Sequence, residues 1–547
     1  MVIYIISFAY GGTNMIGDKI YELRKKHNLT QEAFAELIAV SRQAVQKWEK
    51  NTSFPDSDKL ISISRIFNVS VDYILGIETM DPNQEFRVKR EIQPSYQALH
   101  WWEVYSSQLG VEYQQCIDEG KDIAKLKNLI ESIHALETST YKEQLADTLH
   151  TMIQNSPNQL DYQYNEPDEL NMIYPLTKHD YVYPFTKLSS HTLKSKIKGA
   201  WMGRICGCLL GKTVEGIRTE ELIPLLKETG NYPMHRYILK SDMNEEIYSK
   251  YKFNLRNRCY ADAIDYAPSD DDTNYTVLSS VILDKYTDMF TSYDVAKTWL
   301  EKQPKNAYCT AERVAFLNIV KGFLPPETAV YKNPFREWIG AQIRVDYYGY
   351  INPGDPKKAA YMAWKDARVS HVKNGVYSSM LIAAIIAAAA CCDNMKEAIY
   401  YGLYQIPQTS RLYKAVMKII KQHESGMSAE KCFETIHNEY DEHVGHHWCH
   451  AISNTCVVIA SLLYGNNDYS KSICLAVQTG FDTDCNGATV GSIIGMQKGI
   501  EHIPVYWTAP IKNKLDTSIF GIGVVDTDYL TDKTYQHVIS FSNIYKV

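Results

Sequence analysis

Apolar residues recur at three- and four-residue intervals along most of the chain, the spacing that places them on one face of an α-helix. Residues 15–76 form a compact run of short amphipathic segments, and charged periodic stretches follow as far as residue 153. Residues 156–188 are rich in Tyr, Pro and Asn, which is typical of a linker. From about residue 191 onward the pattern is long, helical and rich in Ala, Gly and Leu. Period-two alternation is sparse throughout, so the sequence predicts an all-α protein.

These changes in pattern divide the chain into four predicted segments. An N-terminal extension covers residues 1–14, and a helix-turn-helix DNA-binding domain covers 15–76. A helical connector and linker cover 77–190, and a large all-helical domain covers 191–547. An apolar helical stripe lies between positions 101 and 117 of the connector, where we expect a bridging or dimerising role and assign no chemistry.

The first domain has the pattern of two short helices joined by a tight turn. Thr30 and Ser41 stand where each can cap one of these helices. This is the helix-turn-helix arrangement, whose second helix enters the DNA major groove. The second helix is apolar on the face of Val45 and Trp48, and its opposite face carries the candidate base-reading residues Arg42, Gln43, Gln46 and Lys47. Arg recognises guanine and Gln recognises adenine through paired hydrogen bonds, so we expect binding to double-stranded DNA; packing on a protein is the alternative.

The same segment resembles the Cro/C1-type (XRE) helix-turn-helix family over its whole length. The matching residues are Leu29-Thr30-Gln31, Phe34-Ala35, Val40 to Val45, Trp48-Glu49 and Val69 to Gly76. The resemblance implies that Gln31, at the start of a helix, contacts a DNA phosphate. One such domain per chain indicates a homodimer that reads two half-sites.

Two acidic clusters about 210 residues apart each precede a predicted helix in the large domain. The first is Asp270-Asp271-Asp272, and the second contains Asp482 and Asp484. Backbone N–H groups and the helix dipole favour ionised carboxylates at such positions, so either cluster alone is also explained as a helix cap. Carboxylates that converge repel one another unless a cation lies between them, and oxygen ligands select hard ions such as Mg²⁺, Mn²⁺ or Ca²⁺.

The helix after the second cluster carries glycines at positions 487, 491, 495 and 499. Glycine costs a helix interior roughly 1 kcal/mol per residue relative to alanine, so this stripe needs a compensating interaction. We expect the close approach of another helix, or of a ligand, along the glycine face.

Residues 195–505 resemble the ADP-ribosylglycohydrolase family, which has an all-α fold and a two-metal site. Several blocks match in the right order: Lys198 to Gly211 with Glu215 just beyond, Asp271-Asp272-Thr273, Ser370-His371 with Gly375 and Tyr377, and Asp482-x-Asp484 with Asn486 and Gly491.

This resemblance implies hydrolysis of an N- or O-glycosidic bond at the anomeric carbon of ADP-ribose, with an ADP-ribosylated molecule as substrate. It implies two Mg²⁺ ions, or Mn²⁺ in their place, held by Asp271, Asp272, Asp482 and Asp484. It makes Glu215 the acid or base of the reaction and places Asp271 and Asp484 in the catalytic set. The family's ligand pocket corresponds here to Ser370, His371, Gly375, Tyr377 and Asn486.

Two positions depart from the family pattern. Asp270 stands where the family usually has Thr, which adds a negative charge and a further candidate ligand. Cys485 stands where Thr or Ser commonly binds the metal, and a soft thiol is a poor partner for Mg²⁺. The second metal therefore depends on whether Asp270 replaces the oxygen that is lost at Cys485.

Three functions are compatible with these residues. The first is a Mg²⁺-dependent ADP-ribosyl hydrolase that also binds specific DNA sequences. The second is a transcriptional regulator whose hydrolase-like domain senses ADP-ribose or a related ligand with little or no catalysis. The third is hydrolysis of a different glycoside, because residues 231–266 resemble an insertion that reshapes the pocket.

A histidine cluster at 443, 446, 447 and 450 invites a transition-metal interpretation, but without an HExxH pattern we expect packing or ligand contact there.

Composition narrows the picture further. A length of 547 residues predicts two or three domains, and a net charge of −7 confines any nucleic-acid surface to a local patch. The 12 cysteines lack paired zinc-binding spacing and are expected to be reduced thiols. The apolar opening residues lack the basic region of a signal peptide. The longest apolar run, residues 380–392, is too short to span a bilayer and suits a buried helix. We therefore expect a cytoplasmic protein without a membrane segment.

Overall fold

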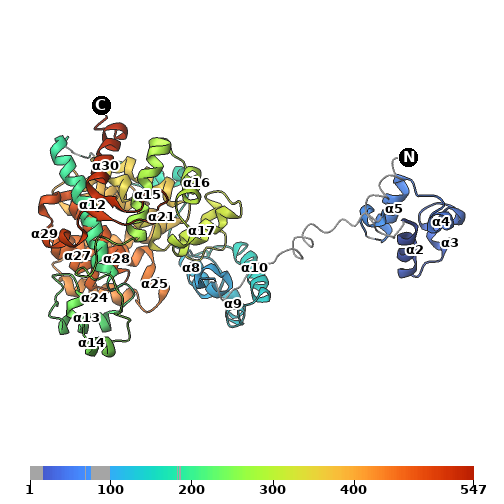
Figure 1. Cartoon of the computed structure of the whole chain (residues 1–547), viewed down its shortest axis with the longest axis horizontal. Helices are drawn as coiled ribbons and strands as arrows, with labels where there is room; N and C mark the ends of the chain where they lie inside the picture. Colours follow the sequence, from blue (N-terminus) through green and yellow to red (C-terminus); the bar gives the residue numbers. More distant parts are fainter. Residues whose placement is uncertain (1–15, 68, 76–98, 182, 184–186, 547) are drawn as a thin grey trace. The chain divides into compact units, whose positions relative to one another are not determined.

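The computed structural model describes residues 16–67, 69–75, 99–181, 183 and 187–546. The predicted extension at 1–14 and the first part of the predicted connector, 77–98, lie outside the described residues. The chain separates into two units, Met1–Ser95 and Tyr96–Val547, so the described connector belongs to the larger unit. Each unit is described by itself below, and its helices are labelled in Figure 1.

The smaller unit consists of five described helices around one small core. They are α2 (Ile16–Lys26), α3 (Gln31–Leu37), α4 (Arg42–Glu49), α5 (Ser57–Phe67) and α6 (Val71–Ile74). The predicted caps are confirmed, because Thr30 accepts the N–H of Ala33 at 3.1 Å and Ser41 accepts that of Ala44 at 3.2 Å. These caps satisfy backbone donors that would otherwise lack partners at the helix starts.

The larger unit begins with the connector, whose helices are shorter than the apolar stripe predicts. The connector elements are η1 (Trp101–Glu103), η2 (Tyr105–Gln108), α8 (Leu109–Asp118), η3 (Ala124–Leu126), α9 (Lys127–His134), α10 (Thr140–Gln154), α11 (Leu170–Ile173) and η4 (Tyr174–Leu176). The first residues of the stripe thus form two short 3₁₀ helices in place of a continuous α-helix. The regular helix starts only at Leu109.

The rest of the larger unit is helical apart from one short antiparallel pair of strands, β1 (Lys514–Leu515) and β2 (Val525–Asp526). Its longer helices are α12 (Ser190–Lys212), α13 (Thr219–Glu228), α15 (Asp271–Tyr286), α16 (Ser292–Lys302), α17 (Thr310–Val320), α20 (Pro356–Ala367), α21 (Lys373–Ala389), α22 (Met395–Leu403), α23 (Arg411–Glu424), α24 (Ala429–Glu439), α26 (Ala451–Tyr464), α27 (Tyr469–Gln478), α28 (Thr483–Lys498) and α30 (Thr527–Phe541). Shorter elements are α14 (Glu245–Lys250), α18 (Glu327–Val330), η5 (Lys240–Asp242), η6 (Thr287–Met289), η7 (Lys305–Ala307), η8 (Ile339–Arg344), α19 (Asp346–Tyr350), α25 (Gly445–Cys449), η9 (Ile500–His502), α29 (Val505–Thr508) and η10 (Ala509–Ile511). The prediction of an all-α protein is confirmed.

Helices α12 and α28 pack against each other along two stripes of glycine, which confirms the expected close approach of a second helix (Figure 1). A Cβ atom built on Gly491 would lie 2.1 Å from the carbonyl oxygen of Gly203. The antiparallel pairing continues to Gly211, whose carbonyl accepts the hydroxyl of Thr483 at 2.9 Å. The contact therefore brings the C-terminal end of α12 beside the start of α28, where the second acidic cluster lies.

The predicted buried apolar helix is α21, whose residues from Asn374 to Ala389 are all buried. It starts earlier and ends slightly earlier than the apolar run at 380–392, and neighbouring helices cover it on all sides. Among the residues that the structure describes, no helix combines the length and apolar character needed to cross a membrane.

The stretch predicted to be a linker packs instead against the larger unit. Tyr377 donates its hydroxyl to the carbonyl of Pro167, and the N–H of Lys373 donates to Asp168 at 2.7 Å. Glu166 pairs with Arg411 at 2.9 Å. Asp168 and Glu166 thus accept free backbone N–H groups at the starts of helices α21 and α23. Polar composition alone does not distinguish a segment with such contacts from a solvated linker.

Candidate active site

The two acidic clusters lie at the first residues of α15 and α28, as the sequence predicts. Asp270 is the N-cap of α15, and its Oδ1 accepts the N–H of Asp272 at 2.9 Å. Asp482 is the N-cap residue of α28 but makes no side-chain capping bond. The simple explanation that both clusters serve as caps therefore applies to Asp270 and does not account for the second cluster.

The side chains of the two clusters meet in space. The ligating atoms of Asp272, Asp484 and Cys485 lie within 4.8 Å of one another, and so do those of Cys208, Asp270 and Asp272. Asp272 is common to both groups. Cys208 lies in the glycine-rich apolar pattern of α12, which predicts a packing role, and the structure places its thiol beside these carboxylates.

Two carboxylate oxygens of this site are buried without a hydrogen-bond partner among the described residues. They are Oδ2 of Asp272, whose residue is fully buried, and Oδ1 of Asp484, whose residue is 3% exposed. An unpaired buried acceptor costs about 1–3 kcal/mol, and more when it is charged. A bound divalent cation would satisfy both oxygens, so the donor set suits a hard ion with an oxygen preference.

Two cationic side chains hold the acidic residues in place. Arg204, on α12, donates to Oδ1 of Asp272 at 3.1 Å and to Oδ2 of Asp346 at 2.6 Å, and all three side chains are buried. Lys212, the last residue of α12, forms an ion pair with Oδ2 of Asp270. Sequence gives no sign of this role for Lys212, because a lysine at the end of a helix is ordinarily solvated and complements the helix dipole.

Burial and mutual repulsion raise the pKa values of several of these acids. Burial, followed by the charges of Asp270 and Asp272, raises the pKa of Asp271 well above its usual value. Burial and the charge of Glu215 do the same to the pKa of Asp484. Asp270 is the exception, because Lys212 outweighs burial and lowers its pKa. These directions are those of carboxylates arranged around a missing positive charge.

Glu215 lies in the turn after α12 and is partly buried. Burial, followed by the negative charges of Asp482 and Asp270, raises the pKa of Glu215 to about 7. A carboxyl group with such a pKa exchanges protons near neutral pH, which is the requirement for general acid–base catalysis.

Asn486 and a second asparagine organise the start of α28. Asn486 is fully buried and donates to Oδ1 of Asn454 at 2.8 Å, while its own Oδ1 lacks a partner among the described residues. The backbone N–H of Asp482 donates to the same Asn454 oxygen at 3.2 Å. Asn454 is not predictable from the sequence, since a single buried asparagine in an apolar helix carries no distinctive pattern.

The other residues of the expected ligand pocket are buried and make internal contacts. Ser370 and Nδ1 of His371 lie 2.8 Å apart, and the hydroxyl of Tyr377 is bonded to Pro167. A Cβ atom on Gly375 would approach the carbonyl of Arg336 to 2.9 Å. Nε2 of His371 is without a hydrogen-bond partner in the described part of the chain. Ligand contact by these four residues stays a prediction.

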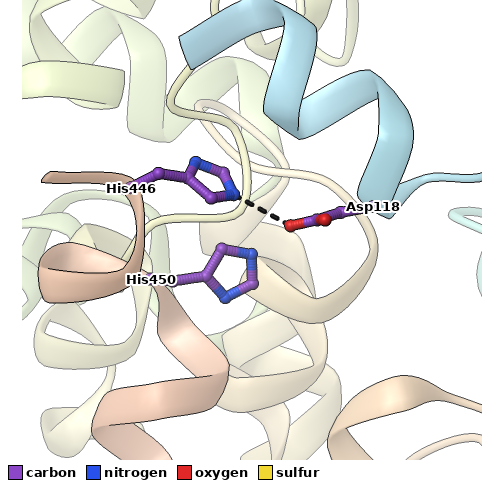
Figure 2. A group of neighbouring side chains, drawn as sticks. All are labelled: Asp118, His446 and His450. Atoms are coloured by element: carbon purple, nitrogen blue, oxygen red, sulfur yellow. Dashed lines mark hydrogen bonds and ion pairs between the residues drawn. The ribbon is translucent and has the colours of Figure 1, made fainter. Parts of the chain in front are cut away.

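A histidine pair offers a second metal candidate, distant in sequence from the acidic clusters. Figure 2 shows His446 and His450 facing Asp118, the last residue of α8, and Nε2 of His446 lies 2.9 Å from Asp118. Trp338 donates its indole N–H to Nδ1 of His446 at 3.2 Å, and the N–H of Ile452 donates to Nδ1 of His450 at 3.1 Å. Nδ1 of each ring therefore accepts a hydrogen bond from a neighbouring N–H group. The contact between His446 and Asp118 joins α25 to helix α8 of the connector.

The candidate DNA-reading residues are exposed on one face of α4. Arg42, Gln43, Gln46 and Lys47 are all exposed, whereas Val45 and Trp48 are buried in the small core. Arg42 pairs with Glu32 at 2.7 Å.

Gln31 is partly buried at the start of α3. It donates to Glu49 at 2.7 Å, and Glu49 also holds Arg24. One N–H of the Gln31 amide is left for another acceptor, because the amide has two.

Comparison with known proteins yields two family matches. The ADP-ribosylglycohydrolase family model matches residues 189–536, more than half of the chain, and a helix-turn-helix family model matches residues 20–74.

Individual proteins match mainly the N-terminal domain. The HTH-type transcriptional regulator YobD of Bacillus subtilis is 35% identical over 88 residues, which are 16% of this chain and 78% of that protein. Repressor protein C2 of Salmonella phage P22 is 28% identical over 89 residues, which are 16% of this chain and 41% of the repressor, so the chain spans less than half of that relative. A solved chain described as an ADP-ribosylglycohydrolase-related protein complex has a TM-score of 0.39 and 17% identity, over 64% of this chain and 99% of that one.

Proposed function

Because the chain belongs to the ADP-ribosylglycohydrolase family, we propose that it is a metal-dependent hydrolase that cleaves the glycosidic bond between ADP-ribose and an acceptor. The observation that carries this proposal is the pair of buried, unpartnered carboxylate oxygens on Asp272 and Asp484. Asp272 and Asp484 stand at the starts of two helices far apart in sequence, and their ligating groups come within 4.8 Å of each other. The charges of Asp482 and Asp270, together with burial, raise the pKa of nearby Glu215 to about 7.

The proposed metal ligands are Asp272 and Asp484, with Asp271 and Asp482 close by in the same cluster. These residues would hold a divalent cation, Mg²⁺ or Mn²⁺, which would supply Lewis-acid polarisation. Arg204 keeps one oxygen of Asp272 occupied and leaves the other free for the ion.

Glu215 is the proposed acid–base residue. The reaction breaks the bond between the anomeric carbon and the acceptor, and a water oxygen replaces the acceptor at that carbon. Protonated Glu215 can give its proton to the departing acceptor atom, and the ionised form can take a proton from the attacking water. With a pKa of about 7, both forms are populated at neutral pH.

We propose that the helix-turn-helix domain binds double-stranded DNA with α4 in the major groove. Arg42, Gln43, Gln46 and Lys47 would face base edges, and Gln31 would use its remaining amide N–H for a phosphate. Two chains would read the two halves of a palindromic site.

The test uses the full chain with arginine-, serine-, ester- and base-linked ADP-ribose, with Mg²⁺ and with a chelator. Release of free ADP-ribose is measured by liquid chromatography. We expect Mg²⁺-dependent release from at least one acceptor, and at least a hundredfold slower release by Glu215→Gln with ADP-ribose binding retained. The presence of both domains in one chain favours a second candidate function, a DNA-binding regulator that senses ADP-ribose. Binding of ADP-ribose without any release would support this second candidate instead. Absence of both binding and release would overturn both functions.

A further inference from the structure

Both oxygens of Asp270 already have partners. Oδ1 accepts the N–H of Asp272, and Oδ2 pairs with the ammonium of Lys212. Asp270 is 6% exposed, so solvent does not compete strongly for either contact. Asp270 therefore does not offer a free oxygen to a metal. It instead holds the ammonium group of Lys212 in the site.

The donor atoms are consequently distributed unequally over the two groups that share Asp272. The group on the side of Asp484 contains two buried carboxylate oxygens that have no hydrogen-bond partner among the described residues, namely Oδ2 of Asp272 and Oδ1 of Asp484. Each group also contains one thiol, that of Cys485 on the side of Asp484 and that of Cys208 on the side of Asp270, and a thiol is a poor ligand for a hard ion. The two sides therefore differ in their carboxylates, because both oxygens of Asp270 are occupied whereas Asp484 keeps one oxygen without a partner among the described residues. A divalent ion on the side of Asp270 would also meet the positive charge of Lys212 at close range.

We infer that the site binds one divalent cation, between Asp272 and Asp484, and that the ammonium of Lys212 takes the place of a second ion beside Asp270. This inference rests on the proposed metal-dependent function. It identifies Lys212 as a positioning residue that balances the charge of Asp270 and fixes the metal stoichiometry.

Charge balance supports a single ion. Asp270, Asp271, Asp272, Asp482 and Asp484 bring five carboxylates together, and Arg204 is shared between Asp272 and Asp346. Lys212 neutralises Asp270 directly, which leaves the opposite side with the unbalanced charge. A cation is therefore attracted to the side of Asp484, where the free oxygens are.

The experiment measures Mn²⁺ binding to the full chain, because Mn²⁺ has oxygen preferences similar to those of Mg²⁺ and gives an electron paramagnetic resonance signal. Equilibrium dialysis with elemental analysis counts the ions, and the spectrum distinguishes an isolated ion from a coupled pair. We expect one Mn²⁺ per chain and an uncoupled six-line spectrum. Two ions with a coupled spectrum would overturn the inference but leave the proposed hydrolase intact. Absence of bound Mn²⁺ at millimolar concentration would overturn the metal-dependent function itself.

Substitution of Lys212 tests its role directly. Lys212→Met frees Oδ2 of Asp270, and we expect the stoichiometry to rise from one ion to two, more completely when Cys485→Thr adds an oxygen. The matched control is Lys198→Met. Lys198 lies on the same helix, but it pairs at 2.5 Å with Asp528, which is not part of either acidic cluster. We expect this variant still to bind one Mn²⁺ per chain. Folding of each variant is checked by circular dichroism. A folded Lys212→Met, Cys485→Thr chain that still binds one ion would refute the replacement of a metal by Lys212.

Discussion

Arg204 donates a hydrogen bond from Nη2 to Oδ1 of Asp272 at 3.1 Å, and neither side chain is exposed to solvent. The same guanidinium binds Asp346 at 2.6 Å, so one arginine orients a candidate metal ligand and also connects α12 to α19. A buried ion pair stabilises little relative to an apolar pair, but loss of one partner leaves an unpaired charge in the interior.

We expect Arg204→Met to lower the free energy of unfolding by about 3–5 kcal/mol, because Asp272 and Asp346 lose their shared partner. Denaturant unfolding followed by circular dichroism measures this. The control is Arg256→Met, which removes an ion pair between two exposed side chains, Arg256 and Glu245, and should leave the free energy of unfolding nearly unchanged. Equal losses of unfolding free energy in the two variants would show that burial of the Arg204 ion pairs does not increase their importance for stability.

The acidic site also predicts how stability depends on pH. The pKa of Glu215 is about 7 in the folded chain and 4.5 for the ordinary group, so the folded state binds its proton more tightly. Stability therefore falls as the pH rises from about 4.5 to 7, and the raised pKa values of Asp271 and Asp484 act in the same direction.

With chelator present, we expect Glu215→Gln to lose less stability than the wild type between pH 5 and pH 8, as measured by thermal unfolding. Added Mg²⁺ should stabilise the wild type more at pH 8 than at pH 5, because ion binding requires ionised carboxylates. Identical pH profiles for the two proteins would contradict the raised pKa of Glu215.

Sequence patterns predict those features of the structure that depend on residues close together in the chain. The starts of both helices at the acidic clusters, the caps at Thr30 and Ser41, and the helix contact along the glycine stripe all depend on neighbouring residues or on a repeat of four. Such signals survive without knowledge of the tertiary fold.

The parts that escaped prediction depend on contacts between distant residues. Lys212 and Asp270 are 58 positions apart, and only the packing of α12 brings the ammonium to that carboxylate. The local pattern around Asp168 predicts a linker, because the N–H of Lys373 that it binds lies 205 residues away. In both cases a polar side chain that the sequence pattern predicts to be solvated binds one specific partner inside the larger unit.

The exposed face of α4 makes a prediction about DNA recognition. We expect Gln43→Ala to weaken binding to a selected operator by about 1–3 kcal/mol while leaving affinity for random DNA nearly unchanged, because a base contact is lost. Fluorescence anisotropy at fixed salt measures both affinities. Arg65→Ala, an exposed change on α5 outside the reading face, serves as the control and should keep the ratio of the two affinities. If Gln43→Ala also leaves that ratio unchanged, α4 does not read the bases through this residue.

The pairing of α12 with α28 supplies a test of how the site is assembled. In Gly491→Ala the new Cβ atom would lie 2.1 Å from the carbonyl oxygen of Gly203, so the helices must separate or the chain must unfold. We expect a loss of unfolding free energy of at least about 1–3 kcal/mol, and at least tenfold weaker Mn²⁺ binding, since Asp484 lies on the displaced helix. Gly110→Ala is the matched control, because a Cβ atom at that position in α8 meets nothing within 4 Å and should gain up to about 1 kcal/mol from helix propensity. Unfolding by denaturant and Mn²⁺ titration report the two effects separately. A Gly491→Ala chain as stable as the wild type, with unchanged Mn²⁺ affinity, would mean that the glycine contact does not position the acidic cluster.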